Sequence, residues 1–463
     1  MINIGDLRKY YLSCREALPF LDCWNRLGTK PFAAAHGQSL PAVELPFADR
    51  CNIPVSDNMP VLLQAGTITL DRAEELLKQY PQQNFICVTS ERKLIYDRVR
   101  LLKMATEFQN FYICTANFTP CMLLLEEFYG CGVAGKLIYG SGLPLFSEDA
   151  SLGPIIFSAL PWSIKCDIAG NTLRRLMNLP EIIVPEPERL QTGTLLIDTH
   201  MHFSIAPEFH KAVVHQPQSF WRWAEWRGYM ESAFTAIGIA TPGDLLENTG
   251  TFRPEILKEI QKLCRESLGR MRFYVSFNPE HMEVDKRIME LLLETPECAG
   301  IKIHPPLHRV SADDDRYDIA FAEAERTGKV VLTHSWEDSS YNPVQKLSLP
   351  HLFEKHLKNH PGAKFILGHA GGRPATMDEV CRVCQKYSNV WVDLSGDYFH
   401  DGMLETLTAG IGAERILLGS DSYWFNVHAI FGMLLKSRLS DAEIELIAFK
   451  NAENLYGITA DCY

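Results

Sequence analysis

The sequence predicts an α/β protein in which a smaller α/β domain precedes a C-terminal (β/α)8 barrel. Downstream of residue 192, short apolar runs alternate with amphipathic helical stretches, and such alternation indicates a parallel sheet. Eight runs fit into about 270 residues, the usual size of a barrel of eight strand–helix units. Most of these runs end in histidine, lysine or aspartate, and the chain before residue 192 repeats part of the pattern without those residues.

The expected strands are runs rich in Val, Ile, Leu and Phe. In order they are LLIDTHMHF (195–203), ESAFTAIGIATP (231–242), RMRFYVSFNP (270–279), CAGIKIHPP (298–306), KVVLTHSW (329–336), KFILGHAGG (364–372), NVWVDLSGD (389–397) and RILLGSDSY (415–423). Between them, residues 318–328 and 349–362 have helical spacing. Residues 375–387 also form a predicted helix, so Cys381 and Cys384 are expected to pack in the core rather than bind zinc.

Composition and charge exclude several kinds of partner. The chain has 46% hydrophobic and 22% charged residues, as in an ordinary globular protein, and its net charge is −12. This charge argues against nucleic acid and anionic membranes, because phosphate binding needs a basic surface. No apolar run approaches the ~18 residues of a membrane span, and the N-terminus lacks a signal-peptide pattern. The scattered cysteines predict reduced thiols and a cytoplasmic location.

Polar side chains recur where the predicted strands end. His200 and His202 lie two residues apart, so in a strand both point to the same side. The later strand ends carry Lys302, His304, His334, His369, Asp393 and Asp421. The carboxyl ends of barrel strands converge on one mouth. Three neutral imidazoles and one carboxylate are a normal ligand set for Zn²⁺ or a similar divalent ion, so the pattern favours a metal centre.

The motifs IDTHMHF, GIKIHPP, VVLTHSW, FILGHAGG and ILLGSDSYW resemble those of the amidohydrolase superfamily, in the branch often labelled amidohydrolase-2. That branch contains metal-dependent hydrolases and non-oxidative decarboxylases on a TIM barrel. The resemblance implies one divalent ion, with zinc the first choice, bound by His200, His202, His334 and Asp421. It implies that His369 acts as a base, or as a ligand if a second ion binds, and that Asp421 also moves a proton.

Lys302 and His304 are predicted to bind substrate. They alternate with Ile301 and Ile303, so both should face the barrel interior while the isoleucines pack against helices. By the resemblance, Lys302 meets an anionic group of the substrate. Two alternatives stay open: a carboxylated Lys302 that bridges two ions, and an ion pair between Lys302 and an inner carboxylate such as Asp393.

The first part of the chain is predicted to be a degenerate copy of the second. PQQNFICVTSERK from Pro81 aligns with PGAKFILGHAGGR from Pro361, and AGKLIYGSGLP (134–144) aligns with AERILLGSDSY (413–423). The offset is 279 or 280 residues. We therefore expect residues 1–180 to form a non-catalytic amidohydrolase-like domain, residues 181–193 a proline-rich linker, and residues 194–463 the catalytic barrel.

The copy has lost the residues of the predicted metal centre. Thr89 stands for His369, Gly142 for Asp421 and Gln64 for His334, while Trp24 and Arg26 align with the two histidines of the first strand. The copy is also too short for two or three of the strand–helix units, each of about 30 residues. We expect an incomplete barrel that packs against the catalytic barrel or a second subunit, and homo-oligomerisation stays open.

Three functions follow in order of preference. The first is a hydrolase in which an activated water cleaves an amide, ester or lactone bond of a small molecule. The second is a non-oxidative decarboxylase of an aromatic or enol carboxylic acid, whose carboxylate Lys302 and His304 would hold. The third is a non-enzymatic scaffold. Residues 203–230, rich in aromatic side chains, could cover the mouth of the barrel or form a contact between domains or subunits.

Overall fold

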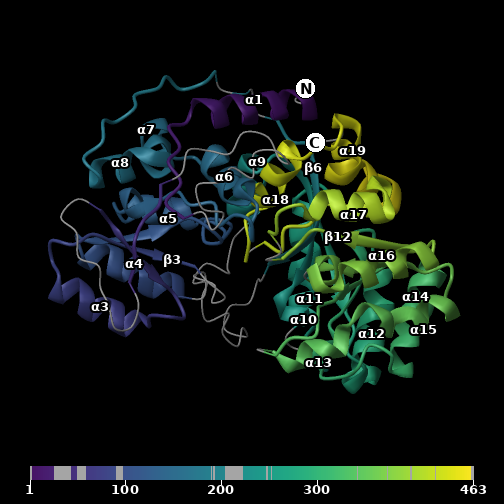
Figure 1. The fold of residues 1–463 in the computed structure, drawn as a ribbon. Helices are drawn as coiled ribbons and strands as arrows, with labels where there is room; N and C mark the ends of the chain where they lie inside the picture. The colour runs from purple at the N-terminus through teal and green to yellow at the C-terminus, as the bar shows by residue number, and fades with distance from the viewer. Residues whose placement is uncertain are drawn as a thin grey trace.

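A computed structural model shows two parallel sheets, each accompanied by helices (Figure 1). The structure describes residues 3–24, 43–48, 59–89, 97–188, 190, 193–203, 223–246, 249–251, 253–340, 342–372, 374–396, 399–422 and 424–459. We call residues 3–188 the N-terminal half and residues 193–459 the barrel half. Arg26 and residues 204–222, which include most of the aromatic segment, lie outside the described residues.

The barrel half contains eight parallel strands in the order β13-β12-β11-β10-β9-β8-β7-β6. They are β6 (Leu196–Phe203), β7 (Thr235–Pro242), β8 (Met271–Ser276), β9 (Cys298–Ile303), β10 (Val330–His334), β11 (Lys364–Gly368), β12 (Val390–Asp393) and β13 (Ile416–Leu417). Each strand pairs with its neighbour in sequence, as in a barrel of successive strand–helix units. The predicted α/β class and the C-terminal barrel are confirmed.

Backbone hydrogen bonds between β6 and the segment after β13 bring the two ends of the sheet together. The amide of Thr199 donates to the carbonyl of Leu418 over 3.0 Å, and the amide of Asp421 donates to the carbonyl of His200 over 2.8 Å. Met201 and Ser422 form an isolated parallel bridge. β13 (Ile416–Leu417) is shorter than the predicted run, and Asp421, four residues after its end, has a left-handed backbone with φ of 59°.

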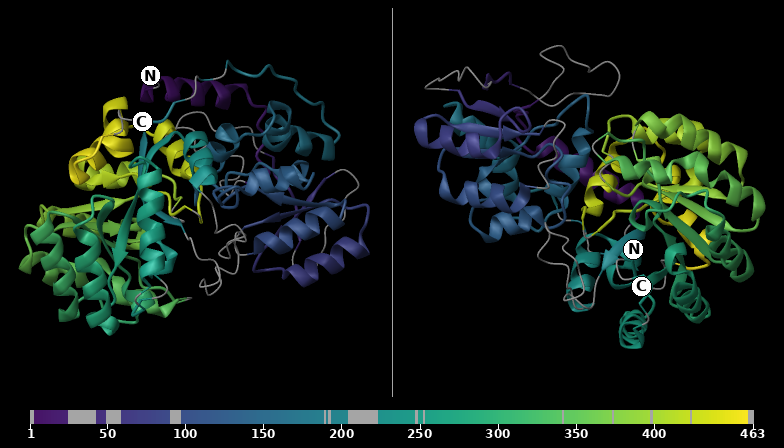
Figure 2. Two further views of the ribbon diagram at one scale, coloured as in Figure 1. Left: turned by 180° about the vertical axis from the view of Figure 1, so that it is seen from behind. Right: turned by 90° about the horizontal axis from the view of Figure 1, so that it is seen from below.

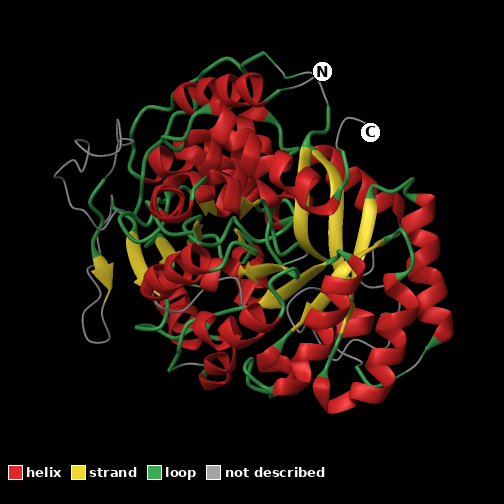
Figure 3. Cartoon of the chain, turned by 90° about the vertical axis from the view of Figure 1, so that its right-hand side faces the viewer, coloured by secondary structure: helices red, strands yellow, loops and turns green. Residues whose placement is uncertain are grey.

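Helices surround the barrel strands (Figure 3). They are α9 (Trp223–Ser232), α10 (Gly243–Leu246), α11 (Pro254–Glu266), α12 (Met282–Leu293), α13 (Pro305–His308), α14 (Asp318–Thr327), α15 (Glu354–Asn359), α16 (Met377–Lys386), α17 (Met403–Ile411), α18 (Val427–Lys436), α19 (Asp441–Glu445) and α20 (Asn451–Tyr456). Short 3₁₀ or π segments are η5 (Pro279–His281), η6 (Asp315–Tyr317), η7 (Pro343–Ser348), η8 (Pro350–Phe353), η9 (His369–Gly371), η10 (Pro374–Thr376), η11 (Ala413–Arg415) and η12 (Leu446–Lys450). The predicted helix that carries Cys381 and Cys384 is α16, and Cys384 belongs to the core.

A buried apolar cluster fills the barrel away from its mouth. It joins Ile197, Leu332, Ile366 and Leu417, from four different strands, with Leu455 of α20. Strands at different points around a barrel share side-chain contacts only through its interior, which is packed with branched residues. This packing leaves the carboxyl ends of the strands as the place for polar residues.

The N-terminal half contains a smaller five-stranded parallel sheet. Its strands are β1 (Phe47–Ala48), β2 (Val61–Gln64), β3 (Phe85–Val88), β4 (Phe111–Cys114) and β5 (Leu137–Ile138). Its helical segments are α1 (Ile4–Ala17), α3 (Leu70–Gln79), α4 (Arg98–Glu107), α5 (Leu124–Gly130), η2 (Ala134–Lys136), α6 (Glu148–Phe157), α7 (Trp162–Cys166), η3 (Asp167–Asn171) and α8 (Thr172–Leu176). Residues 179–188 form no helix or strand. The smaller α/β domain predicted before the barrel is confirmed.

The two halves pack against each other through helices (Figures 1 and 2). α6 lies along α18, and α1 contacts α6, α18 and α19. Asn3 caps α1 by accepting a hydrogen bond from the amide of Asp6. Arg8 of α1 then reaches the barrel half, where its guanidinium donates to the carbonyl of Leu439 and pairs with Asp441 at 2.8 Å.

None of the described helices combines the length and the apolar character of a membrane span.

Candidate metal centre

β6 places two imidazoles at the mouth of the barrel. All eight residues of β6 are buried, and alternation along the strand directs His200 and His202 to one side. Asp421 reaches them from the segment after β13, and its Oδ1 lies 3.0 Å from His202 Nε2. One potential ligand atom from each of His200, His202 and Asp421 lies within 4.8 Å of the others. The structure thus brings three of the four predicted ligands together.

Asp198 fixes this arrangement from deeper in β6. Its carboxylate accepts hydrogen bonds from the amides of His200 (3.2 Å) and Ser420 (3.0 Å), and from the Ser420 hydroxyl. These bonds hold the segment after β13 against β6, and they position Asp421 one residue later. Burial raises the pKa of Asp198 to about 7, although the hydrogen bonds from Ser420 and His200 oppose the rise.

Asp393 of β12 orients His200 from behind. Asp393 Oδ2 lies 2.9 Å from His200 Nδ1, and both side chains are fully buried. A carboxylate at Nδ1 selects the tautomer whose Nε2 carries the lone pair, which is the usual arrangement behind a metal-binding histidine. The other oxygen of Asp393 accepts from the amides of His369 and Ser395, each at 3.0 Å. Asp393 therefore ties together three elements of the site.

His369 lies at the end of β11, next to the other imidazoles. Its ring centroid is 4.8 Å from that of His200 and 4.6 Å from that of His334. Its Nδ1 lies 3.0 Å from the hydroxyl of Ser395. His200, His369 and Asp393 form a second group whose potential ligand atoms lie within 4.8 Å of one another. Both predicted roles of His369, a base beside the ion and a ligand, are compatible with this position.

His334 and His304 stack on each other at the ends of β10 and β9. Their ring centroids are 4.2 Å apart, with an angle of 8° between the planes. His334 Nε2 lies 2.9 Å from Gln345 Oε1, and His304 accepts a hydrogen bond from the amide of Leu307. Among the described residues, the two groups of potential metal ligands do not include His334. His334 is in the site, but its Nε2 is engaged by Gln345.

Lys302 lies inside the site and is 1% exposed. Its Nζ is 2.9 Å from His200 Nε2, on the edge of the imidazole that Asp393 leaves available. No ion pair within 4.0 Å joins Lys302 to Asp393, although both residues belong to the described part of the chain. The structure therefore places the ammonium beside a candidate metal ligand, with a carboxylate behind that ligand.

Burial sets the protonation states of the site. It lowers the pKa of His200, His304 and His334 well below the usual range, and that of His369 to about 3. These imidazoles are neutral at pH 7, which is the form that binds metal ions.

At Lys302 and Asp421, neighbouring charged and polar groups oppose the effect of burial on the pKa. Burial lowers the pKa of Lys302 to about 8, with Asp393 and Asp421 opposing the change. Burial raises the pKa of Asp421, but the hydrogen bond from His202 and the neighbouring imidazoles outweigh it, so the pKa lies well below its usual value. Asp421 is a carboxylate at neutral pH.

The residues present fit a divalent cation. His200 and His202 offer imidazole nitrogens, Asp421 offers a carboxylate oxygen, and Asp393 supports His200 from behind. Nitrogen and oxygen donors of this kind suit zinc, manganese or iron. Sequence reasoning missed Asp198, Ser395 and Gln345 as parts of the site. The first two stand two residues from His200 and Asp393 in the sequence, whereas Gln345 lies in a connection with no such signal.

A family model described as Amidohydrolase matches residues 197–458, which include all eight barrel strands but the first residue of β6. The chain belongs to this amidohydrolase family. The resemblance predicted from the strand-end motifs is confirmed, and with it membership in a family of enzymes. A comparison with curated proteins finds no match.

Solved structures resemble part of this chain at low identity. 5-Carboxyvanillate decarboxylase from Sphingomonas paucimobilis is 14% identical over 58% of this chain and 100% of its own, with a TM-score of 0.44. A putative amidohydrolase from Staphylococcus aureus is 17% identical over 57% of this chain and 100% of its own, with a TM-score of 0.45. 2,6-Dihydroxybenzoate decarboxylase from Rhizobium is 14% identical over 58% and 99%, with a TM-score of 0.43.

Proposed function

We propose that this amidohydrolase-family chain uses one divalent metal ion, held by His200, His202 and Asp421, to decarboxylate a small carboxylic acid. The observation that carries the proposal is the ammonium of Lys302, buried in the site 2.9 Å from His200 Nε2. A buried cation beside metal ligands needs an anionic partner. A carboxylate of the substrate supplies that partner.

The balance of charge in the site supports an anionic substrate. A divalent ion and Lys302 would bring three positive charges, against two negative charges from Asp393 and Asp421. The imidazoles with lowered pKa are neutral, and Asp198, with a pKa of about 7, adds at most one further negative charge. The loaded site would therefore carry no net negative charge and up to one positive charge, which favours a carboxylate over a neutral molecule.

Lys302 would bind the substrate and supply the proton in this reaction. Lys302 holds the carboxylate and orients the bond to be broken. The carbon–carbon bond then breaks, carbon dioxide leaves, and the electron pair stays on the substrate carbon. That carbon takes a proton from the ammonium of Lys302, which is already beside it, and the amine regains a proton from solvent. A bound ion would supply Lewis acidity at a substrate oxygen.

Hydrolysis of an amide, ester or lactone is the second candidate, and the position of His369 favours it. Its neutral imidazole lies beside His200 and His334, and Ser395 fixes its Nδ1. From there it can accept a proton from an attacking water, which is the role of a general base. The scaffold hypothesis is the weakest, because a scaffold needs neither a buried lysine nor converging imidazoles.

The experiment is an assay of the zinc- or manganese-loaded protein against two sets of compounds. One set contains aromatic and enol carboxylic acids and is scored by release of carbon dioxide; the other contains esters, amides and lactones and is scored by hydrolysis. We expect carbon dioxide release that is lost in Lys302→Met. Hydrolysis without carbon dioxide release, at a rate that Lys302→Met leaves unchanged, would refute the proposal. Asp421→Asn is the metal-deficient control for both sets.

A further inference from the structure

The helices of the two halves correspond at a constant distance along the chain. A shift of 279 residues carries α4 (Arg98–Glu107) onto α16 (Met377–Lys386), α6 (Glu148–Phe157) onto α18 (Val427–Lys436) and α7 (Trp162–Cys166) onto α19 (Asp441–Glu445). The same shift carries the π-helix η3 (Asp167–Asn171) onto the π-helix η12 (Leu446–Lys450). π-Helices are rare, so two at equivalent positions are a specific correspondence.

The hydrogen bonds around Asp22 and Asp198 correspond as well. In the N-terminal half, Asp22 accepts from the amides of Trp24 (2.9 Å) and Ser141 (3.0 Å) and from the Ser141 hydroxyl. Asp198 makes the same three kinds of contact with His200 and Ser420, as described above. Trp24 therefore stands where the barrel half has the candidate ligand His200.

The contact between the halves has the symmetry of a two-fold axis. α6 and α18 are equivalent helices, and they cross at Gly153 and Gly432, which the same shift relates. A Cβ atom on Gly153 would lie 2.0 Å from the carbonyl oxygen of His428, and one on Gly432 would lie 2.7 Å from that of Asp149. The shift also relates Asp149 to His428. Each helix thus meets the other through the same positions, as in an isologous dimer interface.

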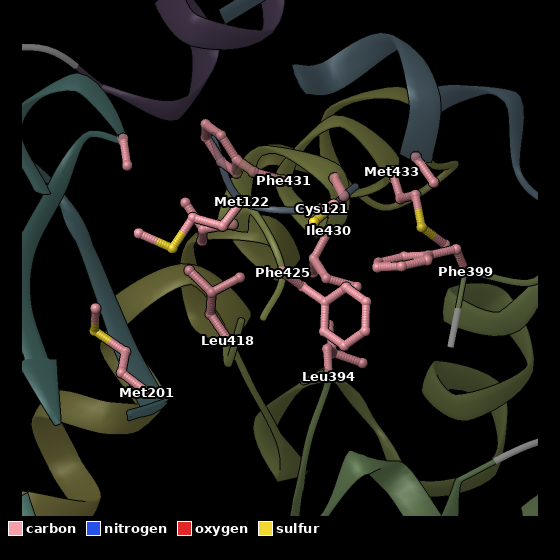
Figure 4. Close-up of a cluster of buried hydrophobic side chains, with 14 of the residues drawn as sticks. Cys121, Met122, Met201, Leu394, Phe399, Leu418, Phe425, Ile430, Phe431 and Met433 are labelled. Carbon is pink, nitrogen blue, oxygen red and sulfur yellow. The ribbon is translucent and has the colours of Figure 1, made fainter. Parts of the chain in front are cut away.

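Two short backbone pairings repeat this symmetry on either side of the helices. Cys121 forms an antiparallel bridge with Phe425, and Phe146 forms one with His400. The shift relates Cys121 to His400 and Phe146 to Phe425. Each bridge therefore pairs one residue of the N-terminal half with the equivalent of the other bridge's N-terminal residue, as two-fold symmetry requires. Figure 4 shows Cys121 and Met122 of the N-terminal half among barrel-half side chains that include Leu418, Phe425, Ile430 and Phe431.

The hydrogen bonds beside the two bridges are also equivalent. The amide of Asn426 donates to the carbonyl of Pro120 over 2.6 Å, and the amide of Ser147 donates to the carbonyl of Phe399 over 2.7 Å. In addition, the amide of Met122 donates to the carbonyl of Trp424 over 3.2 Å. The N-terminal half therefore holds the segment that follows Asp421 at two points.

We propose that the N-terminal half occupies the place of a second subunit in a symmetric dimer, and that residues 120–122 position Asp421 by holding residues 424–426. On this proposal, the surface around α18 is complementary to an equivalent surface. The N-terminal half of the same chain provides that equivalent surface, around α6. In the N-terminal half, the equivalent segment contacts the barrel half in the same way, but the residue equivalent to Asp421 is Gly142, which cannot bind a metal. The part that concerns Asp421 rests on the proposed metal site.

Cross-linking tests the interface. Phe425→Cys places a thiol opposite the native Cys121, and the double substitution Phe146→Cys with His400→Cys makes the equivalent pair. Directly opposed residues of an antiparallel bridge have Cβ atoms about 4.5–5.5 Å apart, within reach of a disulfide after small shifts. Under mild oxidation, both pairs should form a disulfide within one chain, as peptide mapping would show. Disulfides between chains, or failure of one pair in a protein whose circular dichroism is native, would overturn the proposal.

A matched pair of glycine substitutions tests the effect on the metal. Gly153→Ala, in the N-terminal half, pushes α6 and α18 apart, whereas Gly135→Ala places its methyl group where no atom lies within 4 Å. Gly153→Ala should weaken metal affinity about tenfold or more, the range found when the support of a ligand is lost, and Gly135→Ala should not. Equal affinities in folded protein would contradict the positioning role. If the unaltered chain binds no metal, the proposed function fails, while the cross-links still decide the interface.

Discussion

Replacing Lys302 with Met removes the buried charge of the site while keeping an apolar stem of similar length. Loss of one partner from a buried charge pair costs about 2–5 kcal/mol, and about 1.4 kcal/mol corresponds to a factor of ten. We therefore expect kcat/KM for a carboxylate substrate to fall by between about 30-fold and about 4,000-fold. The assay is steady-state turnover of the best acid found in the screen, measured on metal-loaded protein.

The metal content of Lys302→Met separates the roles of the lysine. The ammonium lies 2.9 Å from His200 Nε2, so its removal takes a positive charge away from the proposed ion, and the bound metal should stay equal or increase. Lys329→Met is the control, because Lys329 donates to backbone carbonyls of Thr295 and Cys298, before β10 begins. Loss of bound metal in Lys302→Met would indicate that the lysine bridges ions. Unchanged turnover would refute its role in binding substrate.

Three other changes test the remaining parts of the site and the fold. If the reaction is hydrolysis, His369→Asn should lower turnover by about 100-fold or more and keep the metal; a loss of metal as large as in His202→Ala would make His369 a ligand. Asp393→Asn should weaken metal affinity about 10- to 100-fold, because His200 loses the carboxylate at its Nδ1; a chelator titration that shows no change would exclude this support. Deletion of residues 1–190 exposes α18 and should make the barrel unstable or insoluble; a soluble, fully active barrel would exclude structural support.

The sequence predicts the barrel because its strands are short, apolar and regularly spaced. It also predicts the convergence of the site, since the carboxyl ends of parallel strands meet at one mouth. His200, His202 and Asp421 come together for this reason, although about 220 residues separate the first from the last along the chain. Periodicity of two places Lys302 inside the site, and the structure agrees.

The details of the site depend on backbone geometry that no periodicity predicts. Asp421 reaches His202 because its backbone is left-handed, and hydrogen bonds from distant segments hold that conformation. Gln345 meets His334 from a 3₁₀ segment, η7, whose path follows from packing. Such contacts follow from the tertiary structure, so the sequence predicts the members of the site more fully than their hydrogen-bond partners.

The symmetric contact between the halves left a partial signal in the sequence. The offset of 279 residues is visible there, but it does not say that equivalent helices touch. Nine of the ten residues of α6 and nine of the ten of α18 are buried, and helices that are apolar on nearly all sides are covered on nearly all sides. That they cover each other is a property of the three-dimensional structure.

The most direct test of the proposed centre is the number of divalent ions bound per chain, measured by elemental analysis of the purified protein and of Asp421→Asn. One complete set of ligands and one degraded set predict a single ion per chain, and most of it should be lost in Asp421→Asn. Two tightly bound ions, or a single ion that Asp421→Asn retains in full, would contradict the assignment of His200, His202 and Asp421 as the metal centre. A chain that binds no ion when metal is supplied would contradict the proposed function as a whole.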